Sequence, residues 1–397
     1  MRRYLLLLVF ALSACAKGSV ETPPPTAGIS YAWVTFDAAR LRGSGASGMA
    51  DRAANRSLTI DDPVRIASTS KIVVALGVMR LVEQGRLSLD DDVSQWLGWQ
   101  LRNPAFPKTP ITLRLLLSHR SSLKDDISYV VPLGQTVQAA IADPKAFDAE
   151  HAPGSYFRYS NLGFPVIASA MENATGERFD RLIHRLVLEP LALDACFNWS
   201  TCSDSKIARA VVLYDAAGAV LRDDLGGSRP KCLVLSLAPE CDVDSYKLGT
   251  NGALFSPQGG LRASARDLAA IGQLLLNDGQ HRGRAFLSKA SIDTMTQPAW
   301  RFDGTNGSTE EGFYCSYGLS IQILPTPAAG CGDDLFGDGR KALGHAGDAY
   351  GVRSGLWIDR KRRVGIAYFS ANNGADPAKG RSSYRAIEEF LANKIEN

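Results

Sequence analysis

The sequence lacks an excess of charge of either sign. Its 397 residues include 44 lysines and arginines and 41 aspartates and glutamates, which gives a formal net charge of +3. Nucleic-acid-binding proteins usually carry a strong basic balance, so the composition predicts no nucleic-acid partner. Internal repeats and long biased tracts are also missing. With 45% hydrophobic and 21% charged residues, we expect a compact globular protein, in one large two-lobed domain or two packed domains.

The sequence also lacks the spacing of a zinc site. It has no Cys-x-x-Cys pair, and its five histidines are not spaced as a ligand set, so we expect no metal. Six of the seven cysteines fall in near neighbours, and an even number in an oxidising compartment favours disulfides. Six cysteines allow fifteen connectivities, of which pairing between near neighbours has the smallest loop-closure cost. The expected pairs are Cys196–Cys202, Cys232–Cys241 and Cys315–Cys331.

The N-terminal hydrophobic run Tyr4–Leu12 is too short to span a bilayer, and it follows two arginines, which predicts a secretory signal. It ends in Leu-Ser-Ala-Cys, which resembles the bacterial lipobox, where the cysteine is lipidated. A plain signal peptide that contains a cysteine is the alternative. We therefore expect a signal peptide at 1–14, a lipid anchor on Cys15 and a proline-rich tether over 15–27. Ala16 favours the periplasmic face of the outer membrane in a Gram-negative host, so the expected location is the bacterial cell envelope.

Strand patterns occur at both ends of the remaining chain. Residues rich in β-branched and aromatic side chains predict a strand over Gly28–Asp37, and the segments YGLSIQIL, VRSGLWID and VGIAYFSAN predict further strands near the C-terminus. A last amphipathic helix is expected over Tyr384–Ile395. The middle shows mainly helical patterns, of which SARDLAAIGQLLLNDG has a capping-box start at Ser264 and Asp267.

This order predicts an α+β fold for residues 28–397. We expect an antiparallel sheet with strands from both termini, flanked by helices, and an inserted, mainly helical lobe. The sheet lobe would cover about 28–70 and 310–397, and the helical lobe about 71–309. We expect a monomer.

Ser68, Ser203 and Ser228 are among the serines that are followed by a lysine at the third position. Only Ser68 lies between an extended segment and a long apolar helix pattern, which stops at Gly85. One helical turn separates Ser68 from Lys71, so the hydroxyl and the amine share a face. The positive end of the helix favours negative charge that develops on the serine. Ser68 is therefore the candidate nucleophile.

Two further motifs lie far downstream. Tyr159-Ser-Asn161 is the single Tyr-x-Asn in the chain, where a phenol can relay a proton and an amide can hold a substrate carbonyl. His345-Ala346-Gly347 opens the C-terminal strand hairpin. His119 in LLLSHRSSL is interpreted as a structural residue.

In motif order and spacing, the chain after Gly28 resembles the superfamily of serine β-lactamases and penicillin-binding proteins, in its class C, DD-peptidase and esterase branch. The resemblance implies a β-lactamase/transpeptidase-like fold and no metal or cofactor. It makes Ser68 the acylated nucleophile, with Lys71 and Tyr159 sharing the removal of its proton and His345 completing the catalytic set. A free lysine is protonated at neutral pH, so Lys71 would need a pKa lowered by about three units to act as a base.

The resemblance also implies substrate-binding roles. Asn161 would orient the substrate, and the backbone N–H groups of Ser68 and Asp348 would form the oxyanion hole. Gly347 would let the substrate approach the strand. The carboxylate of Asp348 would either repel anionic substrates and favour cationic or neutral ones, or turn to solvent.

The third motif departs from the family pattern, because Ala346 stands where the Lys-Thr-Gly and His-Thr-Gly relatives have a threonine that helps to hold the substrate carboxylate. We therefore expect an esterase or amidase acting on a small-molecule or peptide substrate without that carboxylate. A class C-like β-lactamase or D-alanyl-D-alanine carboxypeptidase is the first alternative. An envelope-anchored module that binds peptidoglycan or a partner is the second.

Overall fold

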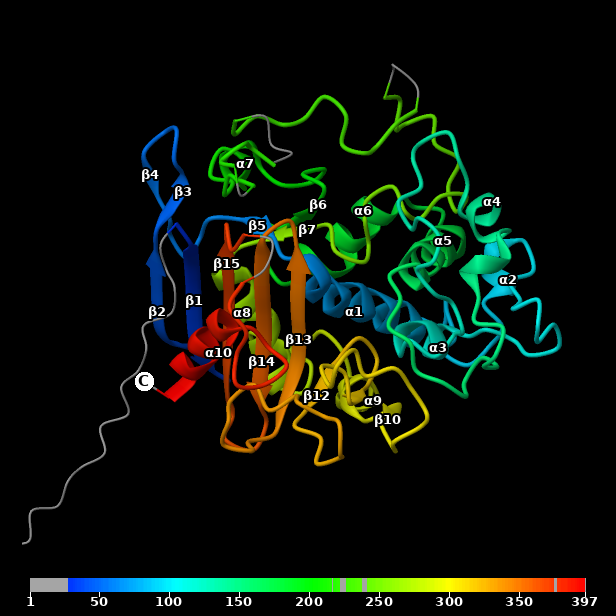
Figure 1. Ribbon diagram of the computed structural model, residues 1–397. Coiled ribbons are helices and arrows are strands. Elements are labelled where there is room, and N and C mark those ends of the chain that lie inside the picture. Colours follow the sequence, from blue (N-terminus) through cyan, green and yellow to red (C-terminus); the bar gives the residue numbers. More distant parts are fainter. Residues whose placement is uncertain (1–27, 216, 222–225, 238–240, 375–376, 397) are drawn as a thin grey trace, which may run out of the picture.

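The computed structural model describes residues 28–215, 217–221, 226–237, 241–374 and 377–396 (Figure 1). The expected signal peptide, Cys15 and the tether lie outside the described residues. Within the described residues, the helices are all too short or too polar to cross a membrane.

An eight-stranded antiparallel sheet forms one side of the molecule (Figure 1). Strand β1 (Ser30–Asp37) pairs along its whole length with β15 (Val364–Ala371), from Ser30 opposite Ala371 to Asp37 opposite Val364. The N-terminal and C-terminal strands thus share one sheet, and the predicted α+β fold with strands from both termini is confirmed. The sheet order is β10 (Trp300–Arg301), β11 (Ser316–Tyr317), β12 (Gln322–Leu324), β13 (Ala342–Ala349), β14 (Val352–Asp359), β15, β1 and β2 (Leu41–Ser47).

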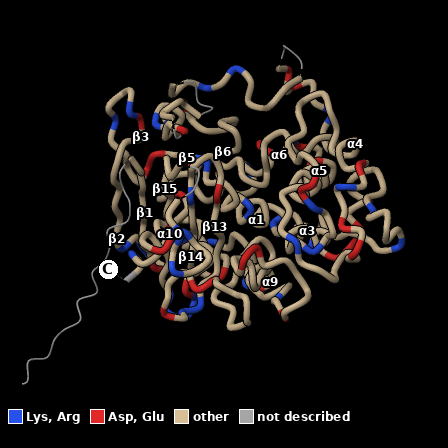
Figure 2. The backbone as a smooth tube through the Cα atoms, in the orientation of Figure 1, with Lys and Arg blue, Asp and Glu red and all other residues tan. Residues whose placement is uncertain are grey.

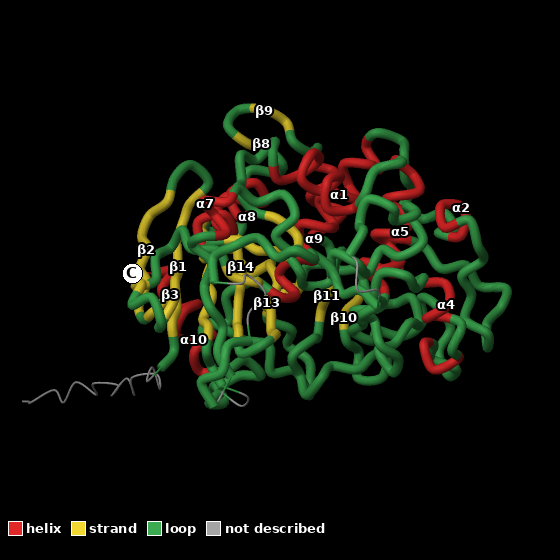
Figure 3. Tube along the Cα trace, turned by 90° about the horizontal axis from the view of Figure 1, so that it is seen from above, coloured by secondary structure: helices red, strands yellow, loops and turns green. Residues whose placement is uncertain are grey.

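Both faces of this sheet are covered by helices, as the view from above shows (Figure 3). Helix α8 (Ala265–Leu276) packs on β1, β14 and β15 from the side of the main hydrophobic core, and α10 (Ala386–Ala392) packs on β14 and β15 from the other side. The predicted capping box starts α8, because Ser264 Oγ accepts from the amide of Asp267 and the Asp267 carboxylate accepts from the amide of Ser264. Helix α8 and strand β10 therefore belong with the sheet, although both precede residue 309, where we placed the lobe boundary.

The segment YGLSIQIL, predicted as one strand, divides into β11 and β12. Ser320 between them has a φ of +58°, and the amide of Gly318 donates to the carbonyl of Ile321 in a tight turn. A residue in the left-handed region reverses the chain direction and cannot continue a strand. The two short strands therefore form a hairpin at the end of the sheet.

A second part of the molecule is mainly helical and lies beside the sheet (Figure 1). Helix α1 (Ser70–Glu83) runs from the sheet into this part, and its residues from Ile72 to Val78 are fully buried because its sequence is apolar on nearly every face. The other helices are α2 (Ser94–Leu97), α3 (Leu113–Leu117), α4 (Val137–Ile141), α5 (Gly163–Thr175), α6 (Phe179–Ile183), α7 (Asp204–Ile207) and α9 (Lys289–Thr296), with a π-helical turn at His184–Leu188 and 3₁₀ turns at Ala67–Thr69, Pro144–Ala146 and Asn393–Glu396.

Three small sheets and three disulfides complete the fold. The small sheets are β5 (Val64–Arg65) with β7 (Leu261–Ala263) and β6 (Cys196–Phe197), β3 (Met49–Asp51) with β4 (Arg56–Ser57), and β8 (Gln280–His281) with β9 (Arg284–Ala285). The disulfides join Cys196 to Cys202, Cys232 to Cys241 and Cys315 to Cys331, which are the expected near neighbours. Positive and negative side chains are interspersed over the backbone (Figure 2).

Candidate active site

Ser68 lies in a tight turn between strand β5 and helix α1. The turn, Ala67–Thr69, begins with a φ of +48° at Ala67, so a non-glycine residue is held in the left-handed region directly before the serine. The helix itself begins two residues after Ser68. Ser68 is partly exposed whereas both of its neighbours are buried, and its side chain lines a cavity between the sheet and the helical part.

Lys71 points its amine at this serine from one helical turn away. The Nζ atom lies 3.0 Å from Ser68 Oγ, 2.8 Å from Asn161 Oδ1 and 2.8 Å from the carbonyl oxygen of Gln258. The side chain is fully buried, and burial lowers the pKa of Lys71 to about 7, against the opposing pull of the carboxylates of Asp125 and Glu310. At neutral pH a large fraction of Lys71 is therefore uncharged.

Tyr159 approaches the serine from the other side. Its hydroxyl donates to Ser68 Oγ at 2.8 Å, and its ring stacks on Tyr314 with 4.6 Å between the ring centres. Burial raises the pKa of Tyr159 above its usual value, so the phenol keeps its proton at neutral pH. Ser68 Oγ thus lies between a buried amine and a neutral phenol.

Asp125 holds the Tyr-x-Asn segment in place. Its two carboxylate oxygens accept hydrogen bonds from the backbone amides of Asn161 and Leu162, from the Asn161 side-chain amide and from the Ser160 hydroxyl, at 2.8 to 3.1 Å. These bonds fix Asn161 so that its oxygen faces Lys71. Asp125 carries no motif of its own, and sequence reasoning missed it.

Strand β13 passes directly behind the nucleophile. A Cβ added to Gly347 would lie 2.4 Å from Ser354 Oγ, 2.5 Å from the carbonyl oxygen of Ile66 and 3.1 Å from the amide nitrogen of Ser68. Only glycine permits this approach. Ser354 Oγ, on the neighbouring strand β14, also donates to the carbonyl of Ile66 at 2.6 Å and lies 2.8 Å from Thr69 Oγ1. The Thr69 hydroxyl donates in turn to the carbonyl of His345 on β13 at 3.3 Å, so both strands are joined to the nucleophile turn by hydrogen bonds.

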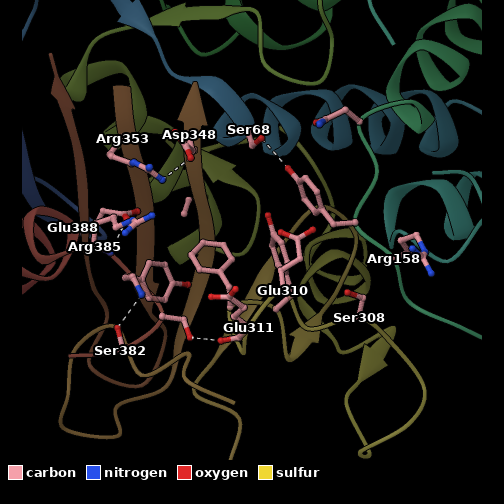
Figure 4. A pocket seen from close by; sticks show the side chains of 18 of the residues that line it. Ser68, Arg158, Ser308, Glu310, Glu311, Asp348, Arg353, Ser382, Arg385 and Glu388 are labelled. Atoms are coloured by element: carbon pink, nitrogen blue, oxygen red, sulfur yellow. Dashed lines mark hydrogen bonds and ion pairs between the residues drawn. The ribbon is translucent and has the colours of Figure 1, made fainter. Parts of the chain in front are cut away.

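The cavity in front of Ser68 has a volume of about 810 Å³ and is strongly charged (Figure 4). Asp348 lies on its wall, where its exposed carboxylate forms an ion pair of 2.6 Å with Arg353 on β14. The negative charge of Asp348 is therefore neutralised by the guanidinium group of Arg353. The charged lining residues are Lys124, Asp125, Asp126, Arg158, Glu310, Glu311, Asp348, Arg353, Lys379, Arg385 and Glu388.

His345 does not line this cavity. Successive side chains of a strand point to opposite faces, so Ala346 and Asp348 line the cavity while the ring of His345 turns into the protein and is fully buried. Its ring centre lies 6.3 Å from that of Tyr159, and its Nε2 atom lies 2.7 Å from the hydroxyl of Tyr317. The structure thus separates His345 from the nucleophile, with which the sequence grouped it.

A chain of hydrogen bonds runs from the Tyr-x-Asn segment to His345. The amide of Ser160 donates to His119 Nδ1 at 3.1 Å, which leaves the ring proton on Nε2, 3.2 Å from the hydroxyl of Tyr317. Tyr317 then donates to His345 Nε2, and His345 Nδ1–H donates to the carbonyl of Ala346. Burial lowers the pKa of His345 to about 3, so its ring is neutral. His119 and Tyr317 thus support the site from behind, a role that the motifs did not reveal.

The rival serine at position 203 has another task. Ser203 caps helix α7, and Lys206 forms an ion pair of 2.8 Å with Asp267. A possible metal-binding group in the described residues is Asp148, Glu150 and His151, outside the cavity lining. Asp148 already accepts from His151 and lies 3.3 Å from a guanidinium nitrogen of Arg158, which disfavours a cation.

Ser68, Lys71 and Tyr159 thus lie together where the antiparallel sheet and the helical part meet. The chain belongs to the beta-lactamase family, whose family model, described as "Beta-lactamase", matches residues 27–389. Curated proteins similar to it include a peptidase and an esterase.

Two curated relatives match shorter segments. The D-alanyl-D-alanine-carboxypeptidase/endopeptidase AmpH of Escherichia coli (strain K12) is 31% identical over 142 residues, which cover 34% of this chain and 36% of AmpH. Esterase EstB of Burkholderia gladioli is 33% identical over 170 residues, 38% of this chain and 42% of EstB. These segments span less than half of either relative. The D-amino acid amidase of Ochrobactrum anthropi SV3, solved in complex with L-phenylalanine, superposes with a TM-score of 0.66 at 19% identity over 93% of each chain.

Proposed function

We propose that the protein hydrolyses esters or amides through an acyl-enzyme on Ser68. The observation that carries this proposal is the geometry of the serine, whose Oγ lies 3.0 Å from Lys71 Nζ and 2.8 Å from Tyr159 Oη at the wall of a large cavity. A nucleophile within hydrogen-bond reach of a base, which is itself oriented by a third group, is the arrangement that covalent hydrolysis needs. Asn161 is that third group.

Lys71 is the base in this mechanism. In its uncharged form it takes the proton of Ser68 while Oγ bonds to the substrate carbonyl carbon. The backbone N–H groups of Ser68 and Asp348 stabilise the oxyanion. Tyr159 passes a proton to the leaving alcohol or amine as the carbonyl–leaving-group bond breaks, and it regains a proton from Lys71, which thereby becomes uncharged again. Water then attacks the acyl-enzyme while Lys71 takes a proton from it, and Lys71 returns that proton to Ser68 Oγ as the ester bond to the serine breaks and the acid is released.

Ala346 supports an esterase or amidase over a β-lactamase or carboxypeptidase. Its methyl group lines the cavity, where it offers a substrate carboxylate no hydrogen-bond donor, and its amide donates to Gln322 Oε1 at 2.9 Å. A substrate carboxylate would lose a partner at this position, so substrates without it are favoured.

Two chromogenic substrates test the ranking. We expect the mature protein to turn over p-nitrophenyl butyrate faster than nitrocefin and to be labelled by a fluorophosphonate. Nitrocefin turnover far above ester turnover would instead favour the β-lactamase. A folded sample that neither hydrolyses the ester nor takes the label would favour the binding module.

We also propose that the protein is a lipoprotein of the bacterial cell envelope. The support is the lipobox-like segment that ends at Cys15, with the proline-rich tether that follows it. Three disulfides agree with an oxidising compartment.

A further inference from the structure

The loop that carries Glu310 and Glu311 forms one wall of the cavity. Both glutamates adopt the left-handed conformation, with φ values of +47° and +58°. The loop is attached to its surroundings at Cys315, which is disulfide-bonded to Cys331, and at the carbonyl of Glu311, which accepts from Ser383 Oγ at 3.0 Å. Glu310 projects from this loop toward the part of the cavity that holds Ser68 (Figure 4). An acidic side chain is thus held on the wall of the cavity that contains the nucleophile, where its charge acts on Lys71.

The carboxylate of Glu310 is not neutralised by an ion pair. Three of the five basic side chains that line the cavity are already paired with acids: Lys124 with Asp126 at 2.7 Å, Arg158 with Asp148 at 3.3 Å and Arg353 with Asp348 at 2.6 Å. In the described part of the chain, no hydrogen-bond donor and no ion-pair partner contacts the carboxylate of Glu310. Desolvation and the carboxylate of Asp125 raise the pKa of Glu310, and the charge of Lys71 opposes this effect.

A second polar group in the cavity wall also lacks a partner. Tyr384 lines the cavity and is 1% exposed, and its hydroxyl has no hydrogen-bond partner among the described residues. This hydroxyl is itself enclosed, but the cavity lining around it is rich in charged side chains, which suits a polar substrate that carries charge.

From this arrangement we propose that Glu310 binds a protonated amine of the substrate, so that the enzyme acts on esters or amides of amino acids with a free amino group. This inference rests on the proposed function of Ser68. Asp348, for which the sequence left a similar role open, is unsuited to it because Arg353 already neutralises its charge. Glu310 instead supplies an exposed carboxylate on the wall of the cavity that holds Ser68, where a substrate ammonium can reach it and be attracted to it.

A bound substrate ammonium would also lower the pKa of Lys71, the proposed base. Asp125 and Glu310 hold the proton on Lys71, against the effect of burial. The other titratable groups around Lys71 are Tyr159, His119 and His345, whose charges do not change near neutral pH because burial keeps them uncharged. A substrate ammonium beside Glu310 offsets that attraction, so Lys71 releases its proton more readily when such a substrate is bound.

A matched pair of substrates tests the proposal. Alanine methyl ester and methyl isobutyrate differ only in that an ammonium group replaces a methyl group, and at about pH 6.5 the amine, with a pKa of about 7.7–8.0, is protonated. Both enantiomers of the alanine ester are assayed, and the measured quantity is the ratio of kcat/KM for the two esters. We expect the wild type to prefer the better alanine enantiomer by about tenfold or more, and Glu310→Gln to lose this preference. Turnover of methyl isobutyrate by Glu310→Gln should be equal to that of the wild type or higher, because loss of the carboxylate also lowers the pKa of Lys71.

Glu311→Gln is the matched control, since it removes the same charge from the next residue of the same loop. Its ratio is expected to stay within about threefold of the wild type, and the wild-type ratio should fall with added salt. Equal preference for the two esters in the wild type, or an unchanged ratio in Glu310→Gln, overturns the proposal. Turnover of p-nitrophenyl butyrate and fluorophosphonate labelling, measured on each variant, show separately that the Ser68 chemistry and the fold are intact.

Discussion

At the scale of single residues, the pKa of Lys71 sets the pH range in which the proposed mechanism can operate. Burial lowers this pKa to about 7, and the uncharged form is the base in the proposed mechanism. Below its pKa the lysine is protonated and cannot accept the proton of Ser68, so kcat/KM for a neutral ester is expected to rise with pH and level off above about 7. The slope below the pKa should be tenfold per pH unit. A profile that is flat between pH 5 and pH 9 would contradict Lys71 as the base.

Gly347 is the residue whose size sets the distance between strand β13 and the nucleophile. Because its Cβ would lie 2.4 Å from Ser354 Oγ and 2.5 Å from the carbonyl oxygen of Ile66, Gly347→Ala must push the strand away from Ser68. We expect kcat/KM to fall about a hundredfold, as a displacement of about 1 Å can produce. Gly163→Ala in helix α5 is the control, because its Cβ would meet Leu116 at an ordinary 3.5 Å. Equal activity of the two variants, measured by ester hydrolysis, would refute the role of Gly347.

The residues of the site differ in how far the sequence predicts them. Ser68, Lys71 and Tyr159 belong to motifs whose local geometry is set within a few residues, and the structure brings them together with Asn161. Asp125 and Glu310 stand in loops without a repeating pattern, so only the tertiary fold brings them to the cavity. His345 was grouped with the nucleophile by its motif, but the alternation of strand β13 turns its ring towards Tyr317.

At the scale of elements, the disulfide between Cys315 and Cys331 anchors the loop that carries Glu310. Its two cysteines are 16 residues apart in the sequence. Replacing both cysteines by alanine increases the conformational entropy of the unfolded chain. A disulfide that closes a loop of about 15 residues contributes about 3 kcal/mol to stability. We therefore expect the free energy of unfolding, measured in urea titrations, to fall by about 2–3 kcal/mol. The preference for the alanine ester should weaken as well, because the loop loses an anchor.

The pair Cys196 and Cys202 serves as the control for that variant. It closes a loop of only six residues outside the cavity lining, so its removal should leave the substrate preference unchanged. A loss of preference in both double variants would show that general destabilisation is responsible.

The sequence predicts the helices and strands that have a clear hydrophobic pattern or a helix cap. It does not predict the places where a turn divides such a pattern. Strands β1, β14 and β15 and helices α1 and α8 follow hydrophobic patterns and caps that the sequence displays directly. The segment YGLSIQIL shows the pattern of one strand, but the left-handed Ser320 divides it. The sequence also places helix α8 in the helical lobe, whereas the helix packs on the sheet. The periodicity of a helix shows that it has an apolar face, but tertiary packing decides which surface that face covers.

At the scale of the whole molecule, the first two strands of the domain lie at one edge of the large sheet. Strand β2 is the edge strand, and strand β1, which the expected tether would directly precede in the chain, lies next to it. If Cys15 is lipidated, the protein should fractionate with membranes and incorporate labelled palmitate. Cys15→Ser should abolish the label and release the domain, with ester turnover unchanged. Retention of the Cys15→Ser variant in the membrane fraction would contradict the anchor.

The sheet and the helical part of the molecule meet at Ser68, which lies between helix α1 and strand β13. In the proposed function, this serine is acylated by the substrate. Intact-mass spectrometry after brief exposure to p-nitrophenyl butyrate tests it most directly. We predict a butyryl adduct that maps to Ser68 and its absence in Ser68→Ala, together with a fall in turnover of about a thousandfold or more and unchanged thermal unfolding. Retained turnover in purified, folded Ser68→Ala, or an adduct on another residue, would contradict the account.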